Sequence, residues 1–182
     1  MNKLSSSNNN INTTVPNNKI SLIWEKIETE GSLECPTGRE GHIFVHLPDK
    51  NSYLIFAGIN NTRYSDVFVL SMDTHKWTEI SPTGEIPKES SYSVGWYDSP
   101  YFFFHGGRNR ELSLTDTYFL DTENWIWRKA FTMEYPSARY HHAVVKTEGK
   151  EAFIFGGYDE KRNRCLGDLH RYEYSKHIVL IL

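Results

Sequence analysis

The side chains that could do chemistry in this sequence are its histidines, cysteines and arginines. Neighbouring histidines such as His141 and His142 would point to opposite faces of a strand, and no carboxylate lies at the spacing of a metal motif. The two cysteines, Cys35 and Cys165, have no nearby base or oxyanion signature and form no Cys-x-x-Cys pair. The pattern therefore predicts no metal, no cofactor and no catalytic residue.

Arginine is concentrated in three polar stretches, residues 59–65, 108–115 and 158–167. With Lys161, these stretches carry a net charge of +3 in a chain whose net charge is −3. Because arginine binds carboxylate and phosphate groups through paired hydrogen bonds, we expect an acidic or phosphorylated segment of a protein partner to bind here. Solvated surface charge is an equal alternative. The candidate contacts are Arg63, Tyr64, Arg108, Arg110, Tyr158, Arg162 and Arg164.

The composition excludes several other classes of partner. Lys and Arg number 20 against 23 for Asp and Glu, so no overall positive field favours nucleic acid or an anionic membrane. No stretch has the length of a signal peptide or of a membrane span. We expect a cytoplasmic protein. Residues 1–19, rich in Asn and Ser, carry too little apolar surface to fold, and we expect a disordered tail followed by one domain over residues 20–182.

From Trp24 onward the chain repeats itself with a period of about 50 residues. Gly58, Gly107 and Gly157 each close an apolar run and are spaced 49 and 50 residues apart. Asp66, Asp116 and Asp168 follow at intervals of 50 and 52, Trp24, Trp77 and Trp127 at 53 and 50, and Arg39 and His42 recur 100 residues later as Arg139 and His142. The markers predict repeats over about 33–82, 83–132 and 133–182.

Each repeat holds four short runs rich in β-branched and aromatic residues, separated by turn residues, which predicts four antiparallel strands. We expect strands over 42–45, 53–56, 67–70 and 77–80 in the first repeat. The second has runs at 92–96, 101–104, 118–120 and 126–127, and the third at 143–145, 152–155, 169–172 and 178–182. The sequence therefore predicts an all-β fold of three four-stranded units, with one extra N-terminal strand at Trp24.

These motifs resemble the kelch repeat. The resemblance rests on residues 36–42 and 136–142, the glycine pairs, the Asp-led strand runs and the spaced tryptophans. It implies a partial β-propeller in which each repeat is one blade. It also implies a non-catalytic protein-binding module, because kelch proteins often bind partners through the loops between the second and third strands.

Most of the recurring residues are expected to hold the blades together. The glycines permit positive φ and close approach of the next blade, the tryptophans bury area between blades, and Arg and His can bind carbonyl or carboxylate groups at the blade junctions. In the middle repeat, Glu89 and Tyr92 stand at the positions of this Arg and His. The expected structural residues are Trp24, Arg39, His42, Gly58, Trp77, Gly106, Gly107, Trp127, Arg139, His142, Gly156 and Gly157.

Three blades do not close a ring, since propellers typically have about four to eight. Three explanations stay open: a fragment of a larger propeller, a chain that associates with itself to complete the ring, and a short array. Two functional alternatives also stay open, an enzyme or enzyme-modifying kelch protein acting on a small molecule, and a truncated propeller without independent function.

Overall fold

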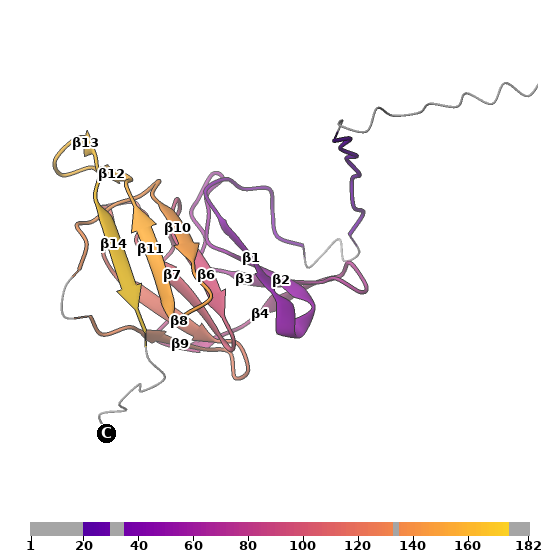
Figure 1. The fold of residues 1–182 in the computed structure, drawn as a ribbon. Helices are drawn as coiled ribbons and strands as arrows, with labels where there is room; N and C mark the ends of the chain where they lie inside the picture. The colour runs from indigo at the N-terminus through magenta and orange to yellow at the C-terminus, as the bar shows by residue number, and fades with distance from the viewer. Residues whose placement is uncertain (1–19, 30–34, 133–134, 175–182) are drawn as a thin grey trace, which may run out of the picture.

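The computed structural model describes residues 20–29, 35–132 and 135–174, which form an all-β, unclosed arrangement of antiparallel sheets (Figure 1). Apart from β-structure, the described residues include one short 3₁₀ turn, η1 (Pro48–Lys50). The partial propeller of four-stranded blades predicted from the sequence is confirmed. The predicted tail at 1–19 and the predicted last strand at 178–182 lie outside the described residues.

Blade one is a four-stranded sheet with its strands in chain order. Its register pairs Tyr53 with His46 on one side and with Leu70 on the other. Its strands are β1 (Ile43–Leu47), β2 (Ser52–Phe56), β3 (Val67–Ser71) and β4 (Trp77–Ile80).

Blade two has the same four antiparallel strands and a short fifth strand, β5 (Thr83–Gly84), which pairs in parallel with the outermost strand. Gly84 has φ +87°, and a Cβ there would lie 2.4 Å from the Trp127 carbonyl oxygen, so the close pairing of β5 requires glycine. The four main strands are β6 (Val94–Asp98), β7 (Tyr101–His105), β8 (Thr117–Asp121) and β9 (Ile126–Lys129).

Blade three shows three of its strands in one sheet, with a two-stranded hairpin in the loop that follows the second strand. The sheet strands are β10 (Ala143–Lys146), β11 (Glu151–Phe155) and β14 (Leu169–Glu173). The hairpin strands are β12 (Tyr158–Asp159) and β13 (Arg164–Cys165). The first strands of the three blades lie next to one another, since β6 contacts both β1 and β10.

Aromatic side chains fill the space between successive blades. Between blades one and two, fully buried Trp127 packs against Phe56, with ring centroids 5.0 Å apart, and against Phe102. Between blades two and three, Phe103 contacts Tyr174 at 4.6 Å. These two clusters are the cores of the molecule, and each belongs to a pair of blades rather than to a single sheet.

The three spaced tryptophans differ in burial. Trp127 is buried, Trp77 is half-buried, and Trp24 is 92% exposed. The predicted N-terminal strand at Trp24 and its burial were wrong, because residues 20–29 form no strand. A strand needs a neighbouring edge to pair with, and in the described structure no strand pairs with this segment. Trp77 stands on the face of blade one that no other described blade covers.

Candidate functional site

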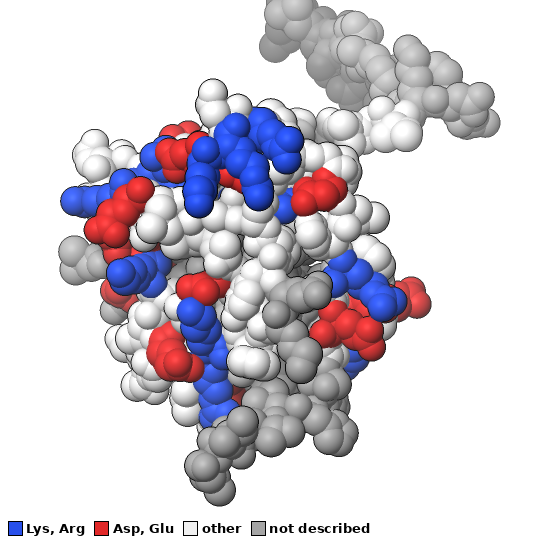
Figure 2. All heavy atoms as spheres, turned by 90° about the vertical axis from the view of Figure 1, so that its left-hand side faces the viewer, with Lys and Arg blue, Asp and Glu red and all other residues white. Residues whose placement is uncertain are grey.

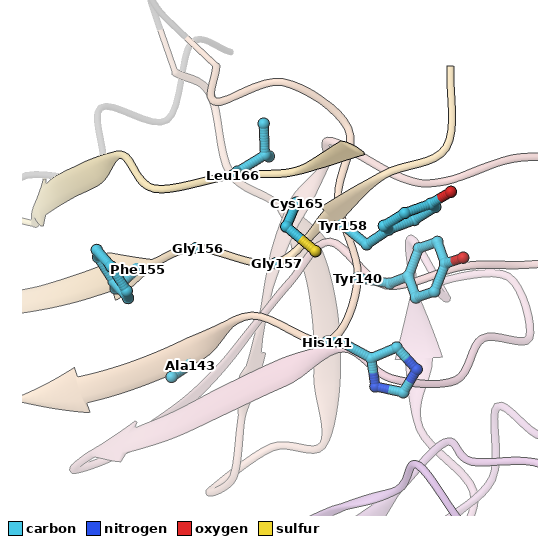
Figure 3. Close-up of a pocket in the computed structure, with 9 residues that line it drawn as sticks. All are labelled: Tyr140, His141, Ala143, Phe155, Gly156, Gly157, Tyr158, Cys165 and Leu166. Carbon is cyan, nitrogen blue, oxygen red and sulfur yellow. The ribbon is translucent and has the colours of Figure 1, made fainter. Parts of the chain in front are cut away.

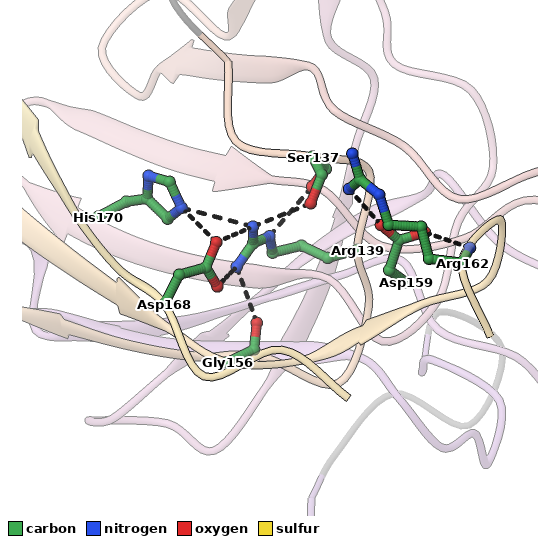
Figure 4. Close-up of polar contacts among 7 residues, drawn as sticks. All are labelled: Ser137, Arg139, Gly156, Asp159, Arg162, Asp168 and His170. Atoms are coloured by element: carbon green, nitrogen blue, oxygen red, sulfur yellow. Dashed lines mark hydrogen bonds and ion pairs between the residues drawn. The ribbon is translucent and has the colours of Figure 1, made fainter. Parts of the chain in front are cut away.

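The residues that precede the first strand of each blade form a lead-in segment, and in blade three this segment is fixed by Arg139. Its side chain is completely buried. The guanidinium donates two hydrogen bonds to the Asp168 carboxylate, at 2.7 and 2.8 Å, and one to the Gly156 carbonyl oxygen at 3.0 Å (Figure 4). Arg139 and then His170, whose Nε2 lies 2.7 Å from Asp168, hold the pKa of the Asp168 carboxyl well below its usual range.

Blade one repeats this arrangement at Arg39. The guanidinium donates to the Asp66 carboxylate at 2.9 Å and to the Ala57 carbonyl oxygen at 3.1 Å, and it lies 4.0 Å from the centroid of the Tyr64 ring. Ala57 and Gly156 occupy the same place, directly after the second strand. Each arginine thus joins three parts of its own blade, and buried polar contacts of this kind fix geometry as well as contributing energy.

Blade two has no such arginine, and its lead-in segment is shifted by one residue from the expected alignment. Gly41, Tyr92 and His141 share a left-handed backbone, with φ values of 60°, 57° and 56°. This places Ser90 and Ser93, not Glu89 and Tyr92, at the positions of the Arg and His. The hydroxyl of Ser93 donates to the Gly106 carbonyl at 3.0 Å. This carbonyl is equivalent to those of Ala57 and Gly156, which arginine binds in the other two blades.

The aspartate of blade two also has a different partner. Lys129, on the last strand, lies 2.8 Å from the Asp116 carboxylate. The middle junction is therefore built from two hydroxyls and one lysine. The sequence did not reveal the roles of these serines or of the lysine, because a shift of one residue within a repeat does not show in the spacing of the recurring residues.

Two histidines are buried between blades two and three. His105 Nδ1 lies 2.9 Å from the Thr117 hydroxyl, and the His142 ring meets the His105 ring edge-on, with centroids 5.5 Å apart. Burial first, and then the nearby Arg139 charge, lowers the pKa of His105 to about 4. Burial and the neighbouring His105 lower the pKa of His142 to about 3. Both rings are neutral at pH 7 and act as packing groups.

The loops of blades two and three are joined to each other. Arg108 lies 2.9 Å from Glu160, and the Ser113 hydroxyl donates to the same carboxylate at 3.2 Å. Asp159, only 4% exposed, accepts from the Arg162 backbone N–H at 2.9 Å and from its guanidinium at 2.8 Å. Two of the three acidic residues in these loops thus hold the hairpin in place, which leaves the surrounding positive charge largely uncompensated.

The remaining cations form an exposed basic patch, which we define as Arg110, Lys161, Arg162 and Arg164. Arg110, Lys161 and Arg164 make no ion pair with any described residue, and all four side chains are exposed. Figure 2 shows Lys and Arg side chains gathered along the upper edge of the molecule, with fewer Asp and Glu side chains among them, at the edge where β12 and β13 lie in Figure 1. An exposed patch of this kind attracts carboxylates and phosphates.

Two of the predicted contact residues lie apart from this patch. Arg63 is half-buried and donates to the Ser91 hydroxyl at 3.1 Å, while Tyr64 stacks under the Arg39 guanidinium. Both have contacts inside the fold. Tyr158 does lie beside the patch, where its ring packs edge-on against Tyr140 with centroids 5.5 Å apart and its hydroxyl bonds Asn163.

A pocket of about 670 Å³ opens beside the hairpin, at the uncovered side of blade three. Figure 3 shows Tyr140 and Tyr158 at one end of it and Ala143 and Phe155 at the other. Sequence reasoning did not predict this pocket, because it arises where no further blade covers the sheet. Its lining is Tyr140, His141, Ala143, Phe155, Gly156, Gly157, Tyr158, Cys165 and Leu166.

The repeated sheets and the repeated lead-in contacts have counterparts in known proteins. The family model of the KLHDC2/KLHL20/DRC7 Kelch-repeats domain matches residues 3–178. The chain belongs to this kelch-repeat family. It is 29% identical to Kelch domain-containing protein 2 of Bos taurus over 87% of the chain and 38% of that protein.

Two further relatives have names that describe different roles. The chain is 25% identical to the mouse Rab9 effector protein with kelch motifs, over 74% of the chain and 37% of that protein. It is 28% identical to N-(sulfonatooxy)prop-2-enimidothioate sulfolyase of Thlaspi arvense, over 74% of the chain and 39% of that protein. The chain thus spans about two fifths of the length of these three relatives.

Two kinds of feature are absent from the described kelch blades. Within residues 20–29, 35–132 and 135–174, no group of three or more His, Cys, Asp or Glu side chains is placed to hold a metal ion. In the same residues, no helix is long and apolar enough to cross a membrane.

Proposed function

We propose that this kelch chain is a non-catalytic, cytoplasmic interaction module whose basic patch binds an acidic or phosphorylated segment of a protein partner. The observation that carries the proposal is that two acidic residues of the loops form ion pairs within the scaffold. Asp159 and Glu160 bind Arg162 and Arg108 within the scaffold, so Arg110, Lys161 and Arg164 keep their charge for a ligand. Loops held on a rigid scaffold are where binding residues concentrate.

The hairpin gives this patch a fixed shape. Asp159 anchors the turn through two bonds to Arg162, and Glu160 ties the hairpin to blade two. A hairpin whose backbone is already ordered loses less conformational entropy on binding, so it binds more tightly than a flexible loop that carries the same charges. Tyr158, which packs on Tyr140 next to the patch, supplies an aromatic surface for an apolar residue of the partner.

The test uses a fluorescein-labelled peptide of alternating Glu and Ser, with a phosphoserine version and a Lys-for-Glu version, followed by fluorescence anisotropy. We expect the acidic and phosphorylated peptides to bind, and the double variant Arg110→Glu, Arg164→Glu to weaken binding at least about tenfold, or about 1.4 kcal/mol. The matched control is Lys76→Glu, Lys88→Glu, which makes the same charge change at exposed positions. Equal losses in both variants would show nonspecific attraction and contradict the proposal.

An enzyme acting on a small molecule is the second candidate. The relative from Thlaspi arvense is named a sulfolyase, and the pocket beside β12 has the volume of a small-molecule site. Incubation of the chain with an N-(sulfonatooxy)imidothioate, with its consumption measured by chromatography, decides between the two. Consumption that the double substitution His141→Gln, Cys165→Ser removes would favour the enzyme.

We also propose that copies of the chain associate with one another. The described residues form three blades, fewer than the roughly four to eight that close a propeller. Association would complete the scaffold and leave the basic patch on its loop face. Light scattering on the purified chain tests this directly, through a mass above the 21.2 kDa of one chain.

A further inference from the structure

Successive blades are joined by three backbone hydrogen bonds made by the lead-in segment. At the junction of blades one and two, the Gly58 N–H donates to the Ser90 carbonyl at 2.8 Å and the Ser90 N–H donates to the Tyr64 carbonyl at 3.1 Å. The third bond runs from the Tyr92 N–H to the Gly41 carbonyl at 2.7 Å. The segment of one blade thus seats against the loop of the blade before it.

The junction of blades two and three repeats the same three bonds at equivalent positions. The Gly107 N–H donates to the Arg139 carbonyl at 2.9 Å, and the Arg139 N–H donates to the Leu114 carbonyl at 3.3 Å. The His141 N–H donates to the Tyr92 carbonyl at 3.1 Å. The repetition predicts which groups a third junction would use.

At the far side of blade three, the equivalent groups are the Gly157 N–H, the Leu166 carbonyl and the His141 carbonyl. None of the three has a backbone hydrogen-bond partner among the described residues. All three residues line the pocket of about 670 Å³. Their equivalents at the two inner junctions are all paired with backbone groups of the next blade, so we call this pocket the open junction.

The opposite end of the molecule carries the complementary groups. In blade one, the equivalents of the lead-in atoms are the N–H and carbonyl of Arg39 and the N–H of Gly41. In the described structure no backbone group bonds to any of them. Two donors and one acceptor at this end therefore match two acceptors and one donor at the open junction.

Apolar side chains are also left exposed at the two ends of the blade series. The side chains of blade one that face blade two are covered, since Phe56 and Val67 are each 0% exposed. Their equivalents on blade three, Phe155 and Leu169, are 55% and 64% exposed, and Val145 is 60% exposed. At the other end of the chain, Phe44 on blade one is 51% exposed. Both ends present apolar surface of the kind that a neighbouring blade buries between blades one and two.

We infer that the lead-in segment of a second copy, residues 39–41, occupies the open junction, so that two chains join head to tail into a six-bladed ring. The inference rests on the proposed self-association and specifies its geometry. The described residues of each copy supply three blades, and six is the one multiple of three within the range of about four to eight blades that propellers adopt. Two identical junctions then close the ring, and each uncovered face of the described blades meets its complement.

Charged substitutions on the two uncovered faces test the arrangement. The equivalent of Phe44 in blade three, Val144, packs into the cluster that contains Trp96, the equivalent of Val145. Phe44 of one copy should therefore lie near Val145 of the other. We expect Val145→Glu alone and Phe44→Lys alone to be monomeric by light scattering, with circular dichroism unchanged because both sites are exposed.

Mixing the two variants gives the decisive result. In a head-to-tail pair of one Val145→Glu chain and one Phe44→Lys chain, the introduced carboxylate and the introduced ammonium group meet at one junction, and the other junction is unmodified. The mixture should therefore return to twice the mass of one chain. Ile86→Glu is the control and should stay dimeric, because Ile86 is 54% exposed and follows β5 at the outer edge of blade two, away from the uncovered faces of blades one and three.

The outcomes distinguish a failure of self-association from a failure of the head-to-tail junction. A folded wild-type monomer at all concentrations overturns self-association itself. A wild-type dimer that survives Phe44→Lys, or a mixture of variants that stays monomeric, overturns the head-to-tail junction while self-association stands. Hydrodynamic masses corresponding to higher, unclosed oligomers would also contradict the six-bladed ring.

Discussion

Replacing Arg139 with methionine tests whether the lead-in arginine is a structural anchor. The substitution keeps most of the apolar volume and removes every donor. It leaves the Gly156 carbonyl without the bond it receives at 3.0 Å and removes two bonds from Asp168. A buried carbonyl left without a donor costs about 1–3 kcal/mol.

The carboxylate contributes less. Asp168 is 44% exposed and keeps His170 as a partner at 2.7 Å, so its share is about 1 kcal/mol after solvent screening. The unfolding free energy should fall by about 2–4 kcal/mol, which for a chain of this size lowers Tm by roughly 4–16 °C. Arg110→Met, at an exposed loop position, is the control.

Urea unfolding followed by tryptophan fluorescence, at one protein concentration, measures the difference. The concentration must be fixed because association would stabilise the folded state by mass action. An Arg139→Met variant within about 0.5 kcal/mol of the wild type, which is the range of ordinary surface substitutions, would refute the anchoring role.

Three further outcomes follow from particular residues. Burial lowers the pKa values of His105 and His142 to about 4 and about 3, so between about pH 6.5 and 4 each histidine binds a proton in the unfolded chain but not in the folded one. The free energy of unfolding should therefore fall by about 2 kcal/mol per histidine from pH 7 to 5. In urea titrations, His105→Gln should remove about half of this pH dependence. Gly107→Ala should destabilise by at least about 1–3 kcal/mol, because its φ is +91° and a Cβ would lie 1.9 Å from the Ser93 hydroxyl, whereas Gly38→Ala, with nothing within 4 Å, should be neutral in the same melts. Trp127→Ala should cost about 3–5 kcal/mol and Trp77→Ala clearly less, since only Trp127 is fully buried; equal losses would contradict the assignment of covered and uncovered faces.

Marker spacing was enough to predict the blades. Short runs of β-branched and aromatic residues, separated by turn residues, gave strands within a few residues of β1–β4 and of β6–β9, because such runs pack well in the half-buried sheets of neighbouring blades. The middle lead-in segment was misaligned because Gly41 and His141 are 100 residues apart while their equivalent, Tyr92, is 51 residues after Gly41. A tyrosine with φ +57° has no sequence signature that would reveal the shift.

The site was only partly predictable for a similar reason. The positive charge of the loops is visible in the sequence, but which acidic group pairs with each arginine depends on how the fold brings the loops together. Arg108 and Arg162 bind acids within the loops, and Arg63 binds Ser91, whereas Arg110 and Arg164 are exposed and unpaired among the described residues. The burial of Trp24 was wrongly predicted because burial depends on a neighbouring blade, which periodicity cannot supply.

We expect the acidic or phosphorylated partner segment to bind on the loops of blades two and three. Hydrogen–deuterium exchange, measured by mass spectrometry with and without the phosphoserine–glutamate peptide, locates the bound surface. Exchange should slow in residues 158–167 and 108–115, with no change in the loop at 59–65, where Arg63 and Tyr64 already have contacts inside the fold. If the peptide binds but leaves exchange in 158–167 unchanged, or slows exchange in 59–65 instead, the partner does not bind on these two loops.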